Sequence, residues 1–205
     1  MEDYNCDYSP IKHRLKETMV NIRNELNESI EAVNDETNCL LCKLEDIRKQ
    51  CVEMESLASS FYLTCYLSAF TDKYQEISES AQQLSEKQHG GLIVIERGTP
   101  VDDYIQKGVP IGAQLSPSLL ESIFYPGNPL HDGAVLVRGS IIDSAANVLP
   151  LTAQTITGKK LGTRHRAALG LSEQTDAMVL VVSEETGKVS FGLNGSLYPI
   201  NMETQ

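Results

Sequence analysis

The chain has 205 residues, of which 41% are hydrophobic, and a formal net charge of −11. This length and apolar content can supply one main domain with a sizeable core and a smaller second element. The acidic balance argues against a nucleic-acid binder, because such domains carry a surplus of Lys and Arg. No apolar run approaches the roughly 18 residues of a membrane span, and the acidic start MEDYNCDYSP is unlike a secretory signal. We therefore expect a cytoplasmic protein that does not contact a membrane.

Residues 1–62 carry two apolar stripes at helical spacing. Hydrophobic residues recur every three or four positions from Ile11 to Val33 and again from Leu40 to Phe61, and the polar stretch NDETN separates the two stripes. This pattern predicts two amphipathic helices that pair as an antiparallel hairpin. Two helices cannot bury all of their apolar surface alone, so we expect residues 1–62 to be an oligomerisation or regulatory segment.

The five cysteines all lie in the first third of the chain. Their odd number and irregular spacing are unlike a disulfide framework and predict free thiols. Cys39 and Cys42 form a C-x-x-C pair, but no second close pair follows at the spacing of a zinc site, and Cys51 and Cys65 fall on an apolar stripe. We therefore favour small buried side chains over zinc or redox chemistry.

Residues 63–205 alternate between helical and strand patterns. Ile77, Ala81 and Leu84 mark a helix that ends near Gly90-Gly91, and a second short helix is expected after Ser116, which is followed by the helix-starting Pro117. The apolar stretches GLIVI, IGAQL, AVLVR and SIIDSAANV predict strands, and DAMVLVVSEETGKVSFGLNG predicts two more strands joined by a turn. The interleaving predicts an α/β fold with a mixed central β-sheet flanked by helices, preceded by the N-terminal helical hairpin.

The stretch GTRHRAALGLSE places cationic side chains at the start of a predicted helix. Thr163 is the expected N-cap, and Arg164, His165 and Arg166 follow in the first turn, where the helix dipole favours acidic residues. The pair Lys159-Lys160 precedes them, with no acidic residue in between. A bound phosphate group would make this arrangement favourable. The alternative is an exposed basic turn.

Two segments with acidic residues lie at the ends of predicted strands. Asp132 precedes Gly133 and an apolar strand, whereas Glu184 and Glu185 end another strand. Each alone could be an ordinary turn. Together with the cationic helix start, they suit a nucleoside triphosphate and a divalent metal. The sequence contains neither the P-loop pattern nor the dinucleotide-binding G-x-G-x-x-G.

Four stretches in this order, LHDGAVLVRG, VLPL, LGTRHRAALGLSE and VVSEETGKVS, closely resemble the diadenylate cyclase family, whose signatures are a D-G-A and an R-H-R motif. The resemblance covers roughly residues 70–197. It implies an enzyme that condenses two ATP molecules into cyclic di-AMP and two pyrophosphates with Mg²⁺ or Mn²⁺. It also assigns residues 63–205 to the catalytic domain and likens the N-terminal helices to the soluble, sporulation-associated subclass of Bacillus-type bacteria, which implies a forespore location.

The resemblance also implies a role for each matching residue. Asp132 would place the metal and activate the 3′-hydroxyl, with His131 as a second metal ligand. The nucleotide would lie against Gly133, Ala134 and Leu149, and the last of these would contact the adenine. The triphosphate would be held by Thr163, Arg164, His165 and Arg166, with Ser183, Glu184 and Glu185 on the other side of the phosphates or the metal.

The geometry of the reaction predicts self-association. An attacking 3′-hydroxyl must be in line with an α-phosphate, and one ATP cannot present both for a two-fold product. Two ATP-loaded sites must therefore face each other in a homo-oligomer, and we expect the N-terminal helices to modulate this pairing, with inhibition favoured. The competing hypotheses are a nucleotide-binding module without turnover and a helical scaffold with an incidental α/β domain. Loss of Asp132 or of the arginines would favour the module, and none is lost.

Overall fold

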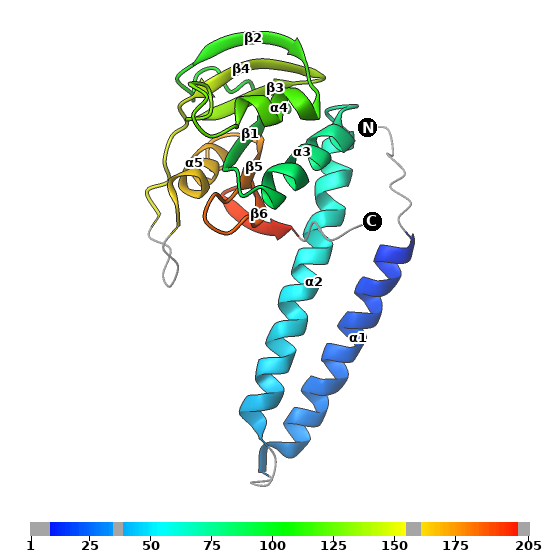
Figure 1. Cartoon of the computed structure of the whole chain (residues 1–205). Helices are drawn as coiled ribbons and strands as arrows, with labels where there is room; N and C mark the ends of the chain where they lie inside the picture. The colour runs from blue at the N-terminus through cyan, green and yellow to red at the C-terminus, as the bar shows by residue number, and fades with distance from the viewer. Residues whose placement is uncertain (1–8, 35–38, 155–160, 201–205) are drawn as a thin grey trace. The chain divides into compact units, whose positions relative to one another are not determined.

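A computed structural model describes residues 9–34, 39–154 and 161–200 (Figure 1). The chain divides into two compact units, Met1–Tyr62 and Leu63–Gln205. Within the described residues, no helix is both long and apolar enough to cross a membrane. The two units are described separately below.

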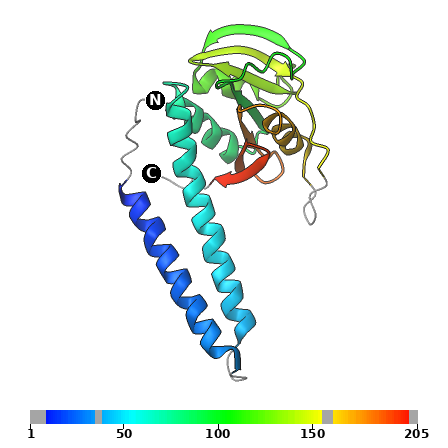
Figure 2. The same ribbon diagram turned by 180° about the vertical axis from the view of Figure 1, so that it is seen from behind.

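The first unit is a helical hairpin. Helix α1 (Ser9–Glu31) ends in a short 3-10 helix (Ala32–Asn34), and α2 (Leu40–Ser68) begins beyond it. The two helices run antiparallel, as both views show (Figures 1 and 2). Gln50 of α2 donates a hydrogen bond of 2.8 Å to the carboxylate of Glu25 on α1. The predicted hairpin is therefore present, and α2 continues beyond Phe61, where its predicted stripe ends.

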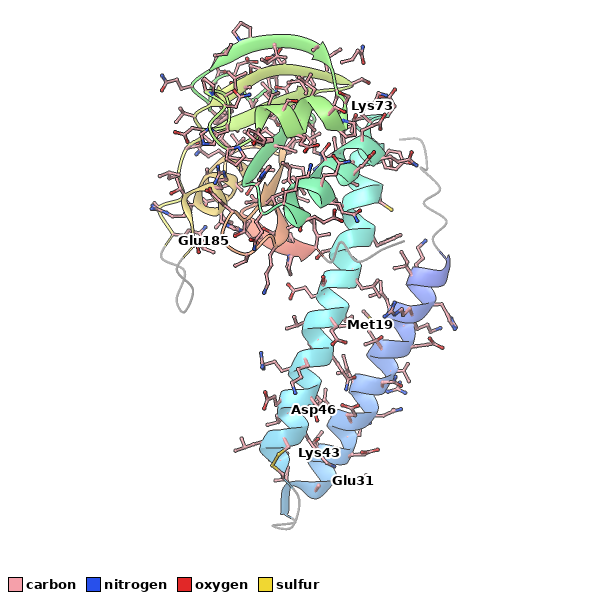
Figure 3. All side chains as sticks on the ribbon, in the orientation of Figure 1. Met19, Glu31, Lys43, Asp46, Lys73 and Glu185 are labelled. Atoms are coloured by element: carbon pink, nitrogen blue, oxygen red, sulfur yellow. A yellow bond between two sulfur atoms is a disulfide. The ribbon has the colours of Figure 1, made fainter. Side chains whose placement is uncertain are left out.

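The hairpin buries little of its apolar stripe. Ile22 and Ile47 are buried, but Met19, labelled in Figure 3, is 55% exposed, and Leu41 is 80% exposed. Exposed apolar surface of this extent is typical of a segment that binds another surface. Other large apolar side chains exposed on the two helices are Val20, Leu26, Ile30, Leu44 and Val52.

The free-thiol prediction is wrong for at least three cysteines. Cys39 and Cys42 form a disulfide, shown as a yellow bond beside the labelled Lys43 in Figure 3. Cys65 is also disulfide-bonded, and Cys51 is a free, half-buried thiol. Residues three apart are brought together by the first turn of a helix, so the Cα atoms of Cys39 and Cys42 lie 5.3 Å apart, within the range of a disulfide. Cys6 lies outside the described residues.

The second unit contains a seven-stranded mixed sheet in the order β2-β4-β3-β1-β5-β6-β7. Strands β1 and β3 are parallel, and the other neighbouring strands are antiparallel. The predicted α/β fold is therefore confirmed, although β7 was not expected. The strands are β1 (Gly91–Ile95), β2 (Val109–Gln114), β3 (Ala134–Arg138), β4 (Ile141–Asn147), β5 (Met178–Val182), β6 (Val189–Leu193) and β7 (Ser196–Ile200).

The central strands are buried on both faces, with alternate residues in two cores. Ile93 and Ile95 of β1 belong to one core with α3 (Tyr74–Glu86) and α4 (Pro117–Ile123). Leu92 and Val94 belong to the other core with α5 (Thr163–Ser172). Successive side chains of a strand point to opposite faces, so a strand covered on both sides is apolar throughout. The sheet therefore lies between helices on both faces.

One of the two predicted helix caps is confirmed, and the other is wrong. Ser116 caps α4, because its hydroxyl accepts a hydrogen bond of 3.3 Å from the amide of Leu119. Thr163 is not the cap of α5, because the carbonyl of Gly162 accepts the first helical hydrogen bond, 3.1 Å from the amide of Arg166. Thr163 is therefore the first helical residue, and no side chain caps α5.

An ion-pair cluster closes the end of the sheet where β1 and β3 finish. The Arg138 guanidinium contacts Glu96 at 2.9 Å, Asp102 at 2.7 Å and Asp143 at 3.3 Å. Hydrogen bonds from Arg138 and Lys107 lower the pKa of the Asp102 carboxyl to about 2. The positive charge of Arg138 is thus surrounded by carboxylates.

Candidate active site

Three sequence motifs meet at one edge of the sheet because of the strand directions. Ile93 of β1 pairs with Val135 of parallel β3, so two residues earlier Gly91 lies level with Gly133. Gly91 also pairs with Val182, the last residue of antiparallel β5. The segments that begin β1, begin β3 and follow β5 therefore share one edge.

Gly133 has a backbone that other residues adopt only with strain. Its φ angle is +122°. A Cβ atom at this position would lie 2.8 Å from the carbonyl carbon of Ala146 and 2.8 Å from the carbonyl oxygen of Asn147. Both atoms belong to the backbone of neighbouring β4 and cannot easily move. Glycine is therefore required for the chain to turn from Asp132 into β3.

His131 and Asp132 precede β3 and carry side chains of the types that bind divalent ions. Nδ1 of His131 donates to the carbonyl of Asn128 at 2.5 Å, so Nε2 is the ring nitrogen that could bind a metal ion. The adjacent Asp132 carboxylate is exposed. Among the described residues, no group of three or more metal-ligating side chains occurs. Imidazole and carboxylate suit a divalent ion that takes its remaining ligands from water and phosphate oxygens.

Arg164 connects α5 to the other two segments of the edge. Its Nη1 donates to Oε2 of Glu184 at 2.8 Å, and this contact lowers the pKa of the Glu184 carboxyl. The guanidinium also lies over Gly90, where a Cβ atom would be 2.4 Å from Nη1. Arg164 is largely buried, with 24% of its side chain exposed. The start of α5, the residue before β1 and the turn after β5 therefore converge on one guanidinium.

The other two residues of the R-H-R motif, His165 and Arg166, lie in different surroundings. Burial lowers the pKa of His165, which favours the neutral imidazole near pH 7. Arg166 is exposed and lies near the carbonyl of Thr152, 3.4 Å from Nη2. Thr163 is an exposed residue at the uncapped start of α5. Arg164 is therefore at the converging edge, whereas Arg166 lies beside the segment after β4. Lys159 and Lys160 lie outside the described residues.

The S-E-E segment forms the tight turn between β5 and β6. The hydroxyl of Ser183 accepts the amide of Thr186 at 3.3 Å and so serves the turn itself. Glu184 and Glu185 are exposed, and Figure 3 labels Glu185. Ser85 at the end of α3 donates a hydrogen bond of 2.6 Å to the carbonyl of Gly187, which ties the turn to that helix.

Two residues predicted to contact the nucleotide, Ala134 and Leu149, are buried in the core. Ala134 is fully buried, and Leu149 is 6% exposed; both belong to the core beneath α5. Val148, next to Leu149, is 57% exposed. Sequence reasoning missed Gly90, because Gly90-Gly91 was interpreted only as a helix end. Its contact with Arg164 depends on residues far apart in the sequence.

Two family models match the chain, one over each of its two units. The family described as DisA bacterial checkpoint controller nucleotide-binding matches residues 78–197, and the family described as Diadenylate cyclase CdaS, N-terminal, matches residues 2–70. The chain belongs to the diadenylate cyclase family.

Relatives span nearly the whole chain. The Diadenylate cyclase CdaS of Bacillus thuringiensis is 50% identical over 94% of this chain and 96% of its own length. The Cyclic di-AMP synthase CdaS of Bacillus subtilis is 54% identical over 83% of this chain and 82% of its own length. A crystal structure of a hypothetical membrane spanning protein from Bacillus cereus has a TM-score of 0.75 and 49% identity, covering 94% of this chain and 95% of that one. A DacA double mutant from Staphylococcus aureus has a TM-score of 0.60 and 43% identity, covering 63% and 87%.

Proposed function

We propose that the protein condenses two ATP molecules into cyclic di-AMP and releases two pyrophosphates. The observation that carries this proposal is the convergence of Arg164, Gly90 and the D-G-A motif at one sheet edge. The names of its relatives, Diadenylate cyclase and Cyclic di-AMP synthase, support the same activity.

The start of α5 is the proposed triphosphate site. Its first-turn amides lack a side-chain cap, and the helix dipole favours a bound anion. Arg164, now paired with Glu184, would exchange that carboxylate for a phosphate oxygen. His165, whose lowered pKa favours the neutral form, would act as a hydrogen-bond donor rather than a charge.

The opposite side of the site would hold the attacking group. Asp132 and His131 would hold a divalent ion, Mg²⁺ or Mn²⁺, which when bound supplies charge neutralisation at the phosphates. Asp132 would also accept the proton of the 3′-hydroxyl, because its carboxylate is exposed at the same edge. Removing this proton makes the hydroxyl oxygen a better nucleophile toward the α-phosphate.

Catalysis requires two copies of the site. The 3′-hydroxyl of one ATP must be in line with the α-phosphate of another, so two domains must face each other across a two-fold axis. The helical hairpin has exposed apolar side chains and is proposed to control this pairing, with inhibition as the favoured effect.

The first test is to incubate the full chain with ATP and either Mg²⁺ or Mn²⁺ and to identify the product by mass. We expect cyclic di-AMP and pyrophosphate in a ratio of one to two. ATP binding without any product would instead favour the nucleotide-binding module.

The role of the hairpin is tested with a shortened chain that begins at Leu63, so that the buried Leu63 and Leu67 remain. If the hairpin inhibits, the shortened chain should form product faster and sediment as a smaller species. A shortened chain that keeps its circular dichroism but is slower at every concentration would contradict inhibition.

A further inference from the structure

The start of α2 carries a pair of cysteines that the proposed cyclase chemistry does not use. Cys39 and Cys42 are joined by a disulfide, and both residues are exposed (Figure 3). We propose that this pair is a reversible thiol-disulfide site that reacts with small disulfides and small thiols. The inference does not depend on the proposed cyclase activity.

The hydrogen bonds at the helix start favour a reactive sulfur at Cys39. The amide of Cys42 donates to Sγ of Cys39 at 3.3 Å, and the carbonyl of Cys39 accepts the amide of Lys43 at 3.2 Å. Cys39 therefore occupies the cap position of a 29-residue helix. First-turn amides and the helix dipole stabilise negative charge on a sulfur at this position, and the thiolate is the nucleophile in disulfide exchange.

The disulfide contributes little to the stability of the fold. A disulfide stabilises mainly by shortening the open loop in the unfolded chain, and this effect grows with loop length. Cys39 and Cys42 are only three residues apart. The bond can therefore open without a large loss of stability, and its exposure gives small reagents access to both sulfurs.

A zinc site explains the pair less well. A structural zinc ion takes four ligands from cysteine and histidine. Within the described ranges, no group of three or more potential ligands occurs. The same two sulfurs already satisfy each other as a disulfide, so redox chemistry is the better assignment.

The oxidation step balances with a small disulfide as the oxidant. The Cys39 thiolate attacks one sulfur of the reagent, the reagent's S–S bond breaks, and one small thiol leaves. Cys42 then attacks Sγ of Cys39, gives up its proton, and displaces the second small thiol. The reagent gains two electrons and two protons, one from Cys42 and one that Cys39 released to solvent when it ionised, and the protein gains the Cys39–Cys42 bond. A small thiol in excess reverses both steps.

The redox state of the pair can be measured on one peptide. Trypsin should release residues 24–43, which contain Cys39 and Cys42 and no other cysteine. The full chain is equilibrated in mixtures of reduced and oxidised glutathione, treated with excess N-ethylmaleimide, which alkylates the free thiols and stops the exchange, and digested. We expect this peptide to change from doubly alkylated to unalkylated as oxidised glutathione rises, and to revert when the mixture is reversed.

Single variants test which sulfur attacks. In Cys42→Ser, the remaining Cys39 should be alkylated about 10-fold faster than the remaining Cys42 in Cys39→Ser, because the helix start favours its thiolate. The matched control Cys51→Ser should leave the transition of peptide 24–43 unchanged. A pair that stays closed in excess reduced glutathione, or stays open in excess oxidised glutathione, would overturn the proposal. Equal alkylation rates would overturn the role of Cys39.

Discussion

Gly90→Ala is the sharpest test of the proposed triphosphate site. The added methyl carbon would lie 2.4 Å from Nη1 and 2.6 Å from Cζ of Arg164, but 3.0 Å from Cβ of Glu184. Ordinary contact begins near 3.4 Å, so the guanidinium must move by about 1 Å, whereas Glu184 must move much less. The guanidinium is the flexible end of a side chain, so we expect the fold to remain.

The expected loss of affinity follows from the displaced contact. A hydrogen bond to a charged group contributes about 1.5–3 kcal/mol, and each 1.4 kcal/mol is tenfold in affinity. Gly90→Ala should therefore weaken binding of a non-hydrolysable ATP analogue by about 10- to 150-fold. Equilibrium titration measures this loss, and thermal unfolding checks the fold.

A double-mutant cycle separates this effect from a general disturbance of the edge. Once Arg164→Ala has removed the guanidinium, Gly90→Ala should cost almost nothing more, because the clashing group is gone. If Gly90→Ala lowered the affinity for the ATP analogue by the same factor with and without Arg164, the inference that Gly90 makes room for the Arg164 guanidinium would be refuted. Unchanged affinity in Gly90→Ala alone would refute the phosphate role of Arg164.

Three further predictions concern other parts of the domain. Asp132→Asn should lower product formation at least about 100-fold with an unchanged melting temperature, because general-base catalysis is lost; near-normal turnover would contradict this. Because Arg138 and Lys107 hold the folded-state pKa of Asp102 near 2, its stabilising effect is present above pH 3.8 and lost as pH falls toward 2. Urea unfolding at pH 5 and pH 2 should therefore show a smaller difference for Asp102→Asn than for wild type. Ser85→Ala should lower the free energy of unfolding by about 1 kcal/mol through its lost bond to the β5–β6 turn, whereas Ser78→Ala, whose hydroxyl bonds within its own helix, should cost less.

The local pattern of residues was enough to predict most elements. Apolar runs identified the central strands, and Ser116 with Pro117 identified the start of α4. Strand β7 was missed although Asn194-Gly195, both with positive φ, is a strong hairpin signal. The cap of α5 was predicted one residue too late. The sequence allows either Gly162 or Thr163 as the cap, and the hydrogen bond from the amide of Arg166 to the carbonyl of Gly162 identifies Gly162.

The site was harder to predict where it depends on distant contacts. The resemblance to a family predicts roles for the motif residues, but the burial of Ala134 and the contact between Gly90 and Arg164 follow from strand order and register. The disulfide was missed because spacing alone cannot say whether a C-x-x-C pair lies at a helix start.

The order of the strands in the sheet also predicts an order of folding. Hairpins β3–β4, β5–β6 and β6–β7 join neighbours in the sequence, whereas β1 must find β3 and β5 across long stretches of chain. Pairings between distant segments pay more loop entropy and form more slowly.

Gly90, Asp132 and Glu184 are brought to one edge when β1 pairs with β3 and β5. A refolding chain should therefore regain most of its sheet signal before it can hold a nucleotide. In stopped-flow refolding, binding of a fluorescent ATP analogue should follow the slowest phase, and binding that appears with the first phase would contradict this order. Nucleotide added during refolding would then stabilise the last contacts formed.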